Sequence, residues 1–199
     1  MRKRIRGFTL IEIVVVLTIT GAILALGFVG FMNYSKSSNL SGATSNVVSI
    51  IGETQSMAKN NVLPISETSE SAVNYTYYYL LEFKTNISAT SINRYIFKKS
   101  KSNVWITTPV STEQDIQIKL LDKAEYGGIG NECTYVLFES MTGKIFLYKQ
   151  LSATLIPPIE NIYKSTILNC DLTVKLADEN LSKKVFVNAE NSNFGIKNE

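Results

Sequence analysis

RGFTLIE, at residues 6–12, opens an apolar run that reaches about Met32 and follows the basic leader MRKRI. Within residues 8–32 the single charged side chain is Glu12. An ionised carboxylate inside a membrane-length segment costs about 2.5–3.5 kcal/mol on insertion scales, so such a residue is usually kept for a function. The stretch therefore predicts a membrane helix in which Glu12 has a functional role.

The apolar run is long enough to cross a bilayer. As a helix, residues 8–32 would extend about 37 Å, against a hydrocarbon core of about 30 Å. Four basic residues at positions 2–6 precede the run, so the positive-inside rule places the N-terminus in the cytoplasm and the chain after Met32 on the far side. A cleaved secretory signal peptide is the alternative, but its apolar region has only about 7–15 residues.

The string GFTLIE after a short basic leader resembles the class III signal of type IV prepilins and type II secretion pseudopilins. The resemblance implies that a prepilin peptidase cuts between Gly7 and Phe8 and methylates the new amine of Phe8. It also implies a subunit held in the cytoplasmic (inner) membrane by its apolar helix. That helix would later form the core of a pilus or pseudopilus, together with other pilin subunits and an inner-membrane assembly platform.

The residues around the predicted cut suit this chemistry. Gly7 has no side chain, which allows a protease to approach the backbone closely. After cleavage Phe8 would carry a positive amine, and Glu12 lies one helical turn away on the same face. The carboxylate would neutralise its own terminus or that of the next subunit, and in the second case it would set the register of assembly. A glutamate that merely reaches the membrane surface is the alternative.

Charge and composition argue against catalysis. Four of the 20 basic residues lie in residues 1–7, so 16 basic residues face 17 acidic ones in the rest of the chain, which is near neutral. The sequence has no histidine, the commonest general base and a favoured metal ligand. It has no Walker loop, Gly-x-Ser-x-Gly, paired-cysteine zinc spacing or His-Glu-x-x-His. We therefore expect no enzyme, no catalytic residue, no cofactor and no metal site.

Residues 33–62 turn polar but keep an apolar stripe at the i, i+3, i+4, i+7 spacing of an amphipathic helix. The stripe consists of Leu40, Ala43, Val47, Ile50, Ile51, Thr54, Met57 and Ala58. Asn60, Asn61 and Pro64 would end the helix. The sequence thus predicts a cleaved leader at 1–7, a transmembrane and filament-core helix at 8–32, its amphipathic continuation at 33–62, and an exported β-rich domain at 63–199.

Beyond Pro64 the pattern changes to β-branched and aromatic runs of period two. Strands are expected at 75–83, 94–98, 104–108, 116–121, 134–139, 144–149, 166–176 and 184–189, with hairpin turns at 140–143 and 190–193. Polar loops are expected at 64–74, 84–92 and 122–132, and Pro157-Pro158 marks a connection. The predicted fold class is α+β and pilin-like, a long N-terminal helix packed on one or two antiparallel sheets.

Three later segments resemble the GspH/FimT-type minor pilins. Residues 47–62 resemble the end of their helix, 135–138 leading to Gly143 resembles one of their hairpins, and 184–188 followed by 194–196 resembles their closing strands. This second resemblance implies a minor subunit of a type IV pilus, a type II secretion pseudopilus or a competence pseudopilus.

The two cysteines, Cys133 and Cys170, would lie on the exported side, where oxidation is permitted. A disulfide between them would close a loop of about 37 residues, worth about 3–4 kcal/mol in the loop-entropy model. Two buried free thiols in neighbouring strands are the alternative.

Two other functional classes remain open. One is a pilus-tip binding module that contacts DNA or a surface, for which the local patch Arg94-Lys98-Lys99-Lys101 would serve; a solvated edge strand explains the same charges. The tyrosines of 75–79 would offer a stacking platform, although alternating tyrosine is also ordinary sheet surface and core. The other class is an unrelated single-span anchored domain that never assembles.

Overall fold

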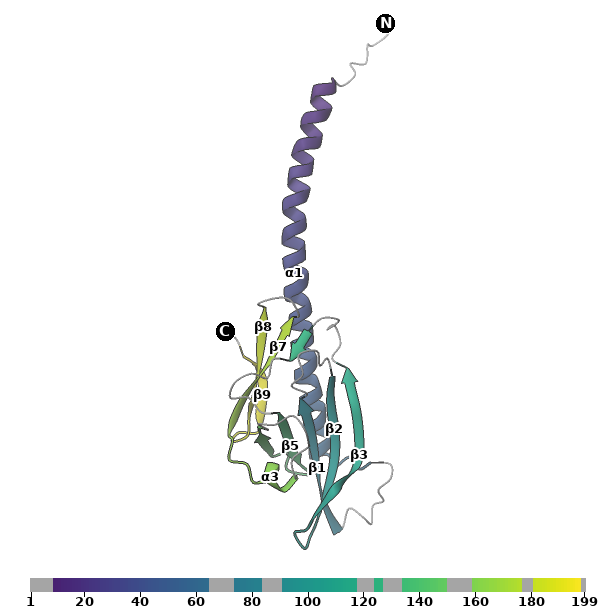
Figure 1. Cartoon of the computed structure of the whole chain (residues 1–199), viewed down its shortest axis with the longest axis vertical. Helices are drawn as coiled ribbons and strands as arrows, with labels where there is room; N and C mark the ends of the chain where they lie inside the picture. Colours follow the sequence, from purple (N-terminus) through teal and green to yellow (C-terminus); the bar gives the residue numbers. More distant parts are fainter. Residues whose placement is uncertain are drawn as a thin grey trace. The chain divides into compact units, whose positions relative to one another are not determined.

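The computed structural model describes residues 9–64, 74–83, 91–117, 124–126, 134–149, 159–176 and 181–197. The chain divides into two compact units, Met1–Ser38 and Asn39–Glu199. Helix α1, Leu10–Lys59, contributes to both units (Figure 1). The prediction of one long N-terminal helix ending near residue 60 is therefore confirmed.

The C-terminal end of α1 is closed by its own backbone. Asn61 has a φ of 49°, and its N–H donates to the carbonyl of Ala58 at 3.0 Å while the N–H of Val62 donates to that of Met57 at 3.0 Å. This pair of bonds is a Schellman motif, in which a left-handed residue, often glycine or asparagine, satisfies the last carbonyls. Asn61 thus stops the helix where the sequence predicted an end.

The second half of α1 buries the stripe that the spacing predicted. Its buried residues are Leu40, Ala43, Thr44, Val47, Ile50, Ile51, Thr54, Gln55 and Ala58. The two threonines among them donate their hydroxyl protons to carbonyls one turn back, those of Leu40 and Ile50. The helix can therefore bury these polar side chains without leaving a donor unpaired.

Two antiparallel sheets pack on this half of the helix, and Figure 1 shows their strands on either side of it. The five-stranded sheet has the order β3 (Trp105–Gln117), β2 (Ser91–Ser100), β1 (Tyr75–Phe83), β5 (Tyr135–Glu139) and β6 (Ile145–Tyr148). The four-stranded sheet has the order β4 (Ala124–Tyr126), β7 (Asn169–Leu176), β8 (Ser182–Asn188) and β9 (Asn193–Lys197). The predicted α+β class with antiparallel sheet is confirmed.

The five-stranded sheet is covered on both faces, because successive residues of a strand point to opposite sides. Tyr77, Tyr79 and Leu81 enter a core shared with α1 and with the four-stranded sheet. Tyr78 and Leu80 enter a second cluster with the short helix α3, Ile159–Tyr163. The tyrosines of 77–79 are therefore buried core residues and no exposed stacking platform.

Gln55 of α1 ties a hairpin turn of each sheet to the helix. Its side-chain amide donates to the carbonyl of Gly143 at 3.3 Å and to that of Ser192 at 2.9 Å. Gly143 has a φ of +65°, and a Cβ there would lie 2.5 Å from Cε of Lys59. The positive φ is what favours glycine at this turn, because the flexible Lys59 side chain can move away from an added Cβ. Both predicted hairpins, at 140–143 and 190–193, are confirmed, and β9 already begins at Asn193.

Three strands expected in the five-stranded sheet have other bounds in the structure. The segments 104–108 and 116–121 were expected as two strands, but residues 105–117 form the single strand β3, and 118–121 lie outside the described residues. Pro109 is accepted inside β3 because β3 lies at the edge of the sheet, where β2 is its one partner among the described strands. Irregularities in that pairing absorb the extra residues. Strand β2 also extends beyond the expected 94–98 and takes in Ser91, which was assigned to a loop.

Two elements were not expected at all. Strand β4 lies inside the segment 122–132, which polar composition had assigned to a loop, and three residues are too few to show periodicity. Helix α3 follows Pro157-Pro158 and has only five residues. Its Ile159 and Ile162 are buried against the outer face of the five-stranded sheet. This tertiary packing stabilises a helix that would be too short to form in isolation.

Candidate functional site

The first turn of α1 holds Glu12 in a reciprocal set of hydrogen bonds with Thr9. The backbone N–H and the hydroxyl of Thr9 each donate to Oε2 of Glu12 at 2.8 Å. In return, the N–H of Glu12 donates to the Thr9 hydroxyl at 3.4 Å. This is a capping box, in which Thr-x-x-Glu satisfies two orphan donors at a helix start. The sequence contains that spacing, so this contact could have been found there and was missed.

The side chains on both sides of Glu12 are exposed throughout the apolar run, from residue 10 to residue 32. The large ones are Leu10, Ile11, Ile13, Val14, Val15, Val16, Leu17, Ile19, Ile23, Leu24, Leu26, Phe28, Val29, Phe31 and Met32. By length and composition this part of α1 is able to cross a membrane. A water-soluble protein rarely exposes so large an apolar surface without a partner. The apolar surface of residues 10–32 therefore calls for a cover of lipid or of other helices.

Polar side chains inside the apolar run are satisfied within the helix. The hydroxyls of Thr18 and Thr20 donate to the carbonyls of Val15 and Val16, at 2.9 and 2.7 Å. Such bonds remove the need for an external acceptor in hydrocarbon. Glu12 is thus the single side chain of this run that brings a formal charge.

The predicted cleavage residues, Gly7 and Phe8, lie outside the described residues. The contact between the Phe8 amine and Glu12 therefore stays a prediction. What the structure adds is that the carboxylate which would receive such an amine is already oriented by Thr9.

Of the two predicted disulfide partners, Cys170 is described. It lies in β7, is 4% exposed, and belongs to the core shared with α1. Cys133 lies just before β5, outside the described part of the chain. Their pairing therefore remains a prediction.

The predicted basic patch is divided by the fold. Arg94 is 5% exposed and points to the α1 side of β2, where Nη1 lies 3.1 Å from Oε1 of Glu53 and 3.0 Å from Oε2 of Glu113. Its Nε donates to the Thr54 hydroxyl at 3.0 Å. Arg94 is therefore a link between the helix and the sheet, and it cannot serve as a surface cation. Strand β2 lies between β3 and β1, so the alternative of an edge strand is also wrong.

Burial sets the chemistry of the core tyrosines. Burial raises the pKa of Tyr79 to about 12, and its hydroxyl donates to the carbonyl of Val62 at 2.7 Å. Burial, followed by the neighbouring Glu139 carboxylate, raises the pKa of Tyr78. Tyr135 shows the same direction, from burial and then from Glu82. These hydroxyls stay protonated at neutral pH, and each donates a hydrogen bond: Tyr78 to Glu139, Tyr79 to the Val62 carbonyl and Tyr135 to Glu82.

In the described ranges no group of three or more histidine, cysteine or acidic side chains is placed to hold a metal ion. The arrangement that stands out in the described part of the chain is a capped, singly charged helix start followed by an exposed apolar surface.

The comparisons with known proteins agree with this view of the N-terminus. The model of the prokaryotic N-terminal methylation motif matches residues 2–28. No curated protein and no solved structure matches the chain. The match supports the prediction that the N-terminus carries a class III signal like that of type IV prepilins and pseudopilins. The matched residues include both the predicted cleavage site and the capping box. A subunit with this motif associates with other pilin subunits and is structural in role.

Proposed function

We propose that this protein is a minor structural subunit of a type IV pilus or of a type II secretion or competence pseudopilus. The observation that carries the proposal is the methylation motif at residues 2–28, which runs directly into an apolar helix with exposed side chains. If the motif belonged to a soluble domain, we would not expect it to be followed by an exposed apolar helix surface. The minor role rests on the resemblance of the later segments to GspH/FimT-type pilins.

The proposed life cycle begins in the cytoplasmic membrane with the N-terminus in the cytoplasm. Prepilin peptidase removes residues 1–7 between Gly7 and Phe8 and methylates the amine of Phe8. The helix over 8–32 remains in the bilayer until an assembly platform extracts it. It then packs against the same helices of other subunits, and the apolar side chains exchange lipid for protein.

Glu12 gives this exchange its register. Both Thr9 donors meet Oε2 of Glu12, and among the described residues none donates to Oε1. That oxygen is open to the terminal amine of a neighbouring subunit. An incoming subunit reduces the penalty of two charges in an apolar environment only when the amine and the carboxylate meet. A helix in any other register leaves both charges unpaired.

Processing provides the first test. Intact-mass analysis of the membrane form should show the loss of residues 1–7 and the addition of one methyl group in cells that contain the peptidase. The unprocessed mass is expected in cells without it. Gly7→Val should block cutting while membrane insertion is unchanged, because the apolar run is intact. Retention of residues 1–7 in the wild-type membrane form would exclude the proposed processing.

Quantity provides the second test, which concerns the minor role. Sheared filaments or pseudopili should contain this chain at a small fraction of the major subunit, measured by quantitative mass spectrometry with labelled peptides. A chain that makes up most of the filament mass would be a major subunit. A processed chain that is absent from every sheared fraction would be a membrane protein that does not assemble.

A further inference from the structure

A row of two lysines and three aromatic rings crosses the outer face of the five-stranded sheet. Nζ of Lys144 lies 5.2 Å from the ring centre of Phe146, which is 4.8 Å from that of Tyr163. Nζ of Lys99 lies 4.6 Å from the Tyr163 ring and 5.0 Å from the Trp105 ring. We call these five residues the cation–aromatic stripe. Lys144 lies in the turn before β6 and the others come from β6, α3, β2 and β3, so the stripe exists only in the folded chain.

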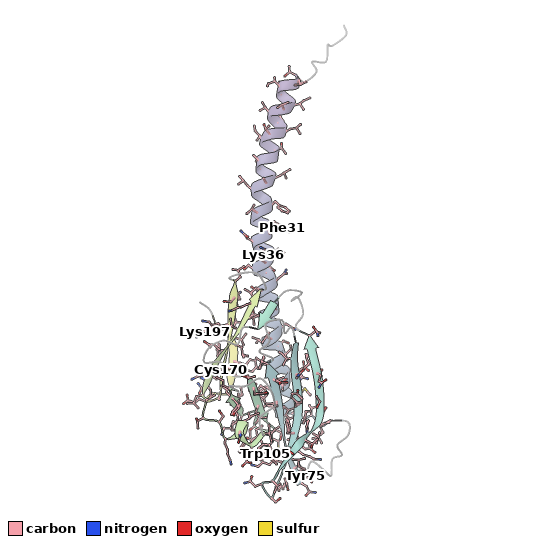
Figure 2. The ribbon with its side chains drawn as sticks, in the orientation of Figure 1. Phe31, Lys36, Tyr75, Trp105, Cys170 and Lys197 are labelled. Carbon is pink, nitrogen blue, oxygen red and sulfur yellow. The ribbon has the colours of Figure 1, made fainter. Side chains whose placement is uncertain are left out.

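Further lysines lie around the same end of the unit Asn39–Glu199. Lys98 lies over the ring of Tyr75 on the opposite face of the sheet, 4.8 Å from its centre. Lys101 is exposed in the turn between β2 and β3, and its N–H donates to the carbonyl of Asn74. Figure 2 shows Tyr75 and Trp105 together at this end. The end therefore presents positive charge on both faces of the sheet.

The acidic side chains that face the stripe are already engaged. Oε1 of Glu139 accepts from the Tyr78 hydroxyl at 3.2 Å and Oε2 from the Thr142 hydroxyl at 2.9 Å. Glu160 pairs with Lys164 on α3. The lysines of the stripe place positive charge beside its rings, and a neutral sugar would bring no negative charge to balance it. The chemistry of the stripe therefore favours an anionic ligand.

We propose that the cation–aromatic stripe is a binding surface for single-stranded nucleic acid. Proteins that bind single strands without sequence preference combine lysines along the phosphate backbone with aromatic rings on which bases stack. A lysine over a ring at an exposed site is worth only about 0.5–1 kcal/mol. Lys99 can therefore leave the rings of Trp105 and Tyr163 for a phosphate and open them to a base. The inference is independent of filament assembly.

The chain offers a direct reporter, because Trp105 is its single tryptophan. The full chain in nonionic detergent would be titrated with a fluorescein-labelled oligothymidylate, with anisotropy and Trp105 fluorescence recorded between 50 and 200 mM salt. Binding should quench Trp105, as stacking requires. Lys99→Ala and Lys144→Ala should each weaken binding severalfold and reduce the salt slope by about 0.7 for each phosphate that is no longer neutralised. Trp105→Leu should weaken binding at least about fivefold and leave the slope unchanged.

Lys183→Ala and Lys197→Ala are the matched controls. They remove the same charge from the other sheet, where Lys183 bonds Ser41 and Lys197 bonds Asp171, and Figure 2 shows Lys197 far from Trp105. All variants keep the basic leader, so its contribution is common to them. Circular dichroism would show whether each variant folds. If Trp105→Leu does not fold, the two lysine variants alone test the proposal.

Three results would overturn the proposal. The first is wild-type protein that does not bind the oligonucleotide at 50 mM salt. The second is a control variant that weakens binding as much as Lys99→Ala, which would show general charge attraction. The third is binding of duplex DNA or heparin with no quenching of Trp105 by the oligonucleotide, which would assign the surface to another polyanion.

Discussion

The carboxylate of Glu12 lies 2.8 Å from both the backbone nitrogen and the hydroxyl of Thr9, across the first turn of α1. The carbonyl of Thr9 accepts the first bond of the helix, from the N–H of Ile13 at 3.3 Å. Glu12 therefore has a structural task, capping the helix, in addition to the assembly task proposed for its charge. The two tasks need different properties, since glutamine can also complete a capping box but has no charge.

Substitution of Glu12 separates capping from charge. Glu12→Gln should keep the bonds from Thr9 but lose the negative charge, and Glu12→Val should lose both. Both variants should insert and be cleaved normally, because the scissile bond and its flanks are intact. If charge pairing drives assembly, both should enter filaments poorly. The measurement is the ratio of filament-associated to membrane-associated protein after shearing, at equal expression.

Thr9→Ala is the matched control for that experiment. It removes the hydroxyl donor and leaves the charge of Glu12, and the loss of a cap typically costs about 0.5–2 kcal/mol of helix stability. Normal assembly of Glu12→Gln combined with a defect in Thr9→Ala would assign Glu12 to capping alone. If Glu12→Val has the same ratio of filament-associated to membrane-associated protein as wild type, neither the charge of Glu12 nor its capping is needed for assembly.

We expect Cys133 and Cys170 to form a disulfide. Denatured, non-reduced protein from its native compartment should resist alkylation at both positions and become fully alkylated after reduction. Replacing both cysteines with alanine should lower the free energy of unfolding by about 3–4 kcal/mol. Complete alkylation without reduction would instead establish two free thiols.

Removing the acidic partners of Arg94 should lower the free energy of unfolding more than removing Arg94 itself. Glu53 and Glu113 have side chains that are 60% and 57% exposed, whereas Arg94 is 5% exposed. The double variant Glu53→Ala/Glu113→Ala leaves a buried guanidinium unpaired and should cost about 3–5 kcal/mol. Arg94→Met leaves two carboxylates that water can solvate, so it should cost clearly less.

Urea unfolding of the full chain in detergent would measure both effects, with Glu53→Ala alone as the control. The single variant keeps the ion pair with Glu113 and should lie within about 1 kcal/mol of wild type. Equal losses for Arg94→Met and the double variant would contradict the importance of the buried charge.

High pH should destabilise the unit Asn39–Glu199 through Tyr79. Its pKa is about 12 in the folded chain and about 10 when unfolded. Between these values the unfolded state releases a proton that the folded state keeps, so the free energy of unfolding should fall as pH rises from about 10 to 12. Below pH 10 both states are protonated, and this contribution should be constant.

Tyr79→Phe isolates that contribution from the lysines, which titrate in the same range. The variant should be less stable than wild type at pH 9, because it cannot form the bond to the Val62 carbonyl. It should also show a smaller decrease in stability between pH 9 and 11.5. An identical decrease in the two proteins would mean that Tyr79 does not control the alkaline transition.

Local patterns were sufficient for the helix and for most strands. The stripe from Leu40 to Ala58 has a period that belongs to one face of a helix, and Asn61 can adopt the left-handed conformation that ends it. Strands with clear alternation, such as β1 and β8, were found for the same reason. β4 and α3 were missed because their few residues carry no period, and they are held in place by partners distant in the sequence.

The candidate site shows the same division. The leader, the apolar run, Glu12 and the Thr-x-x-Glu spacing are all local, so the membrane anchor and the methylation motif can be inferred from neighbouring residues. The tertiary structure alone decided the fate of Arg94 and Lys99, which are five positions apart on one strand. A strand sends odd and even positions to opposite faces, and only the partners on each face determine the outcome. α1 and β3 bury Arg94 between two carboxylates, whereas β3 and α3 surround Lys99 with aromatic rings at the surface.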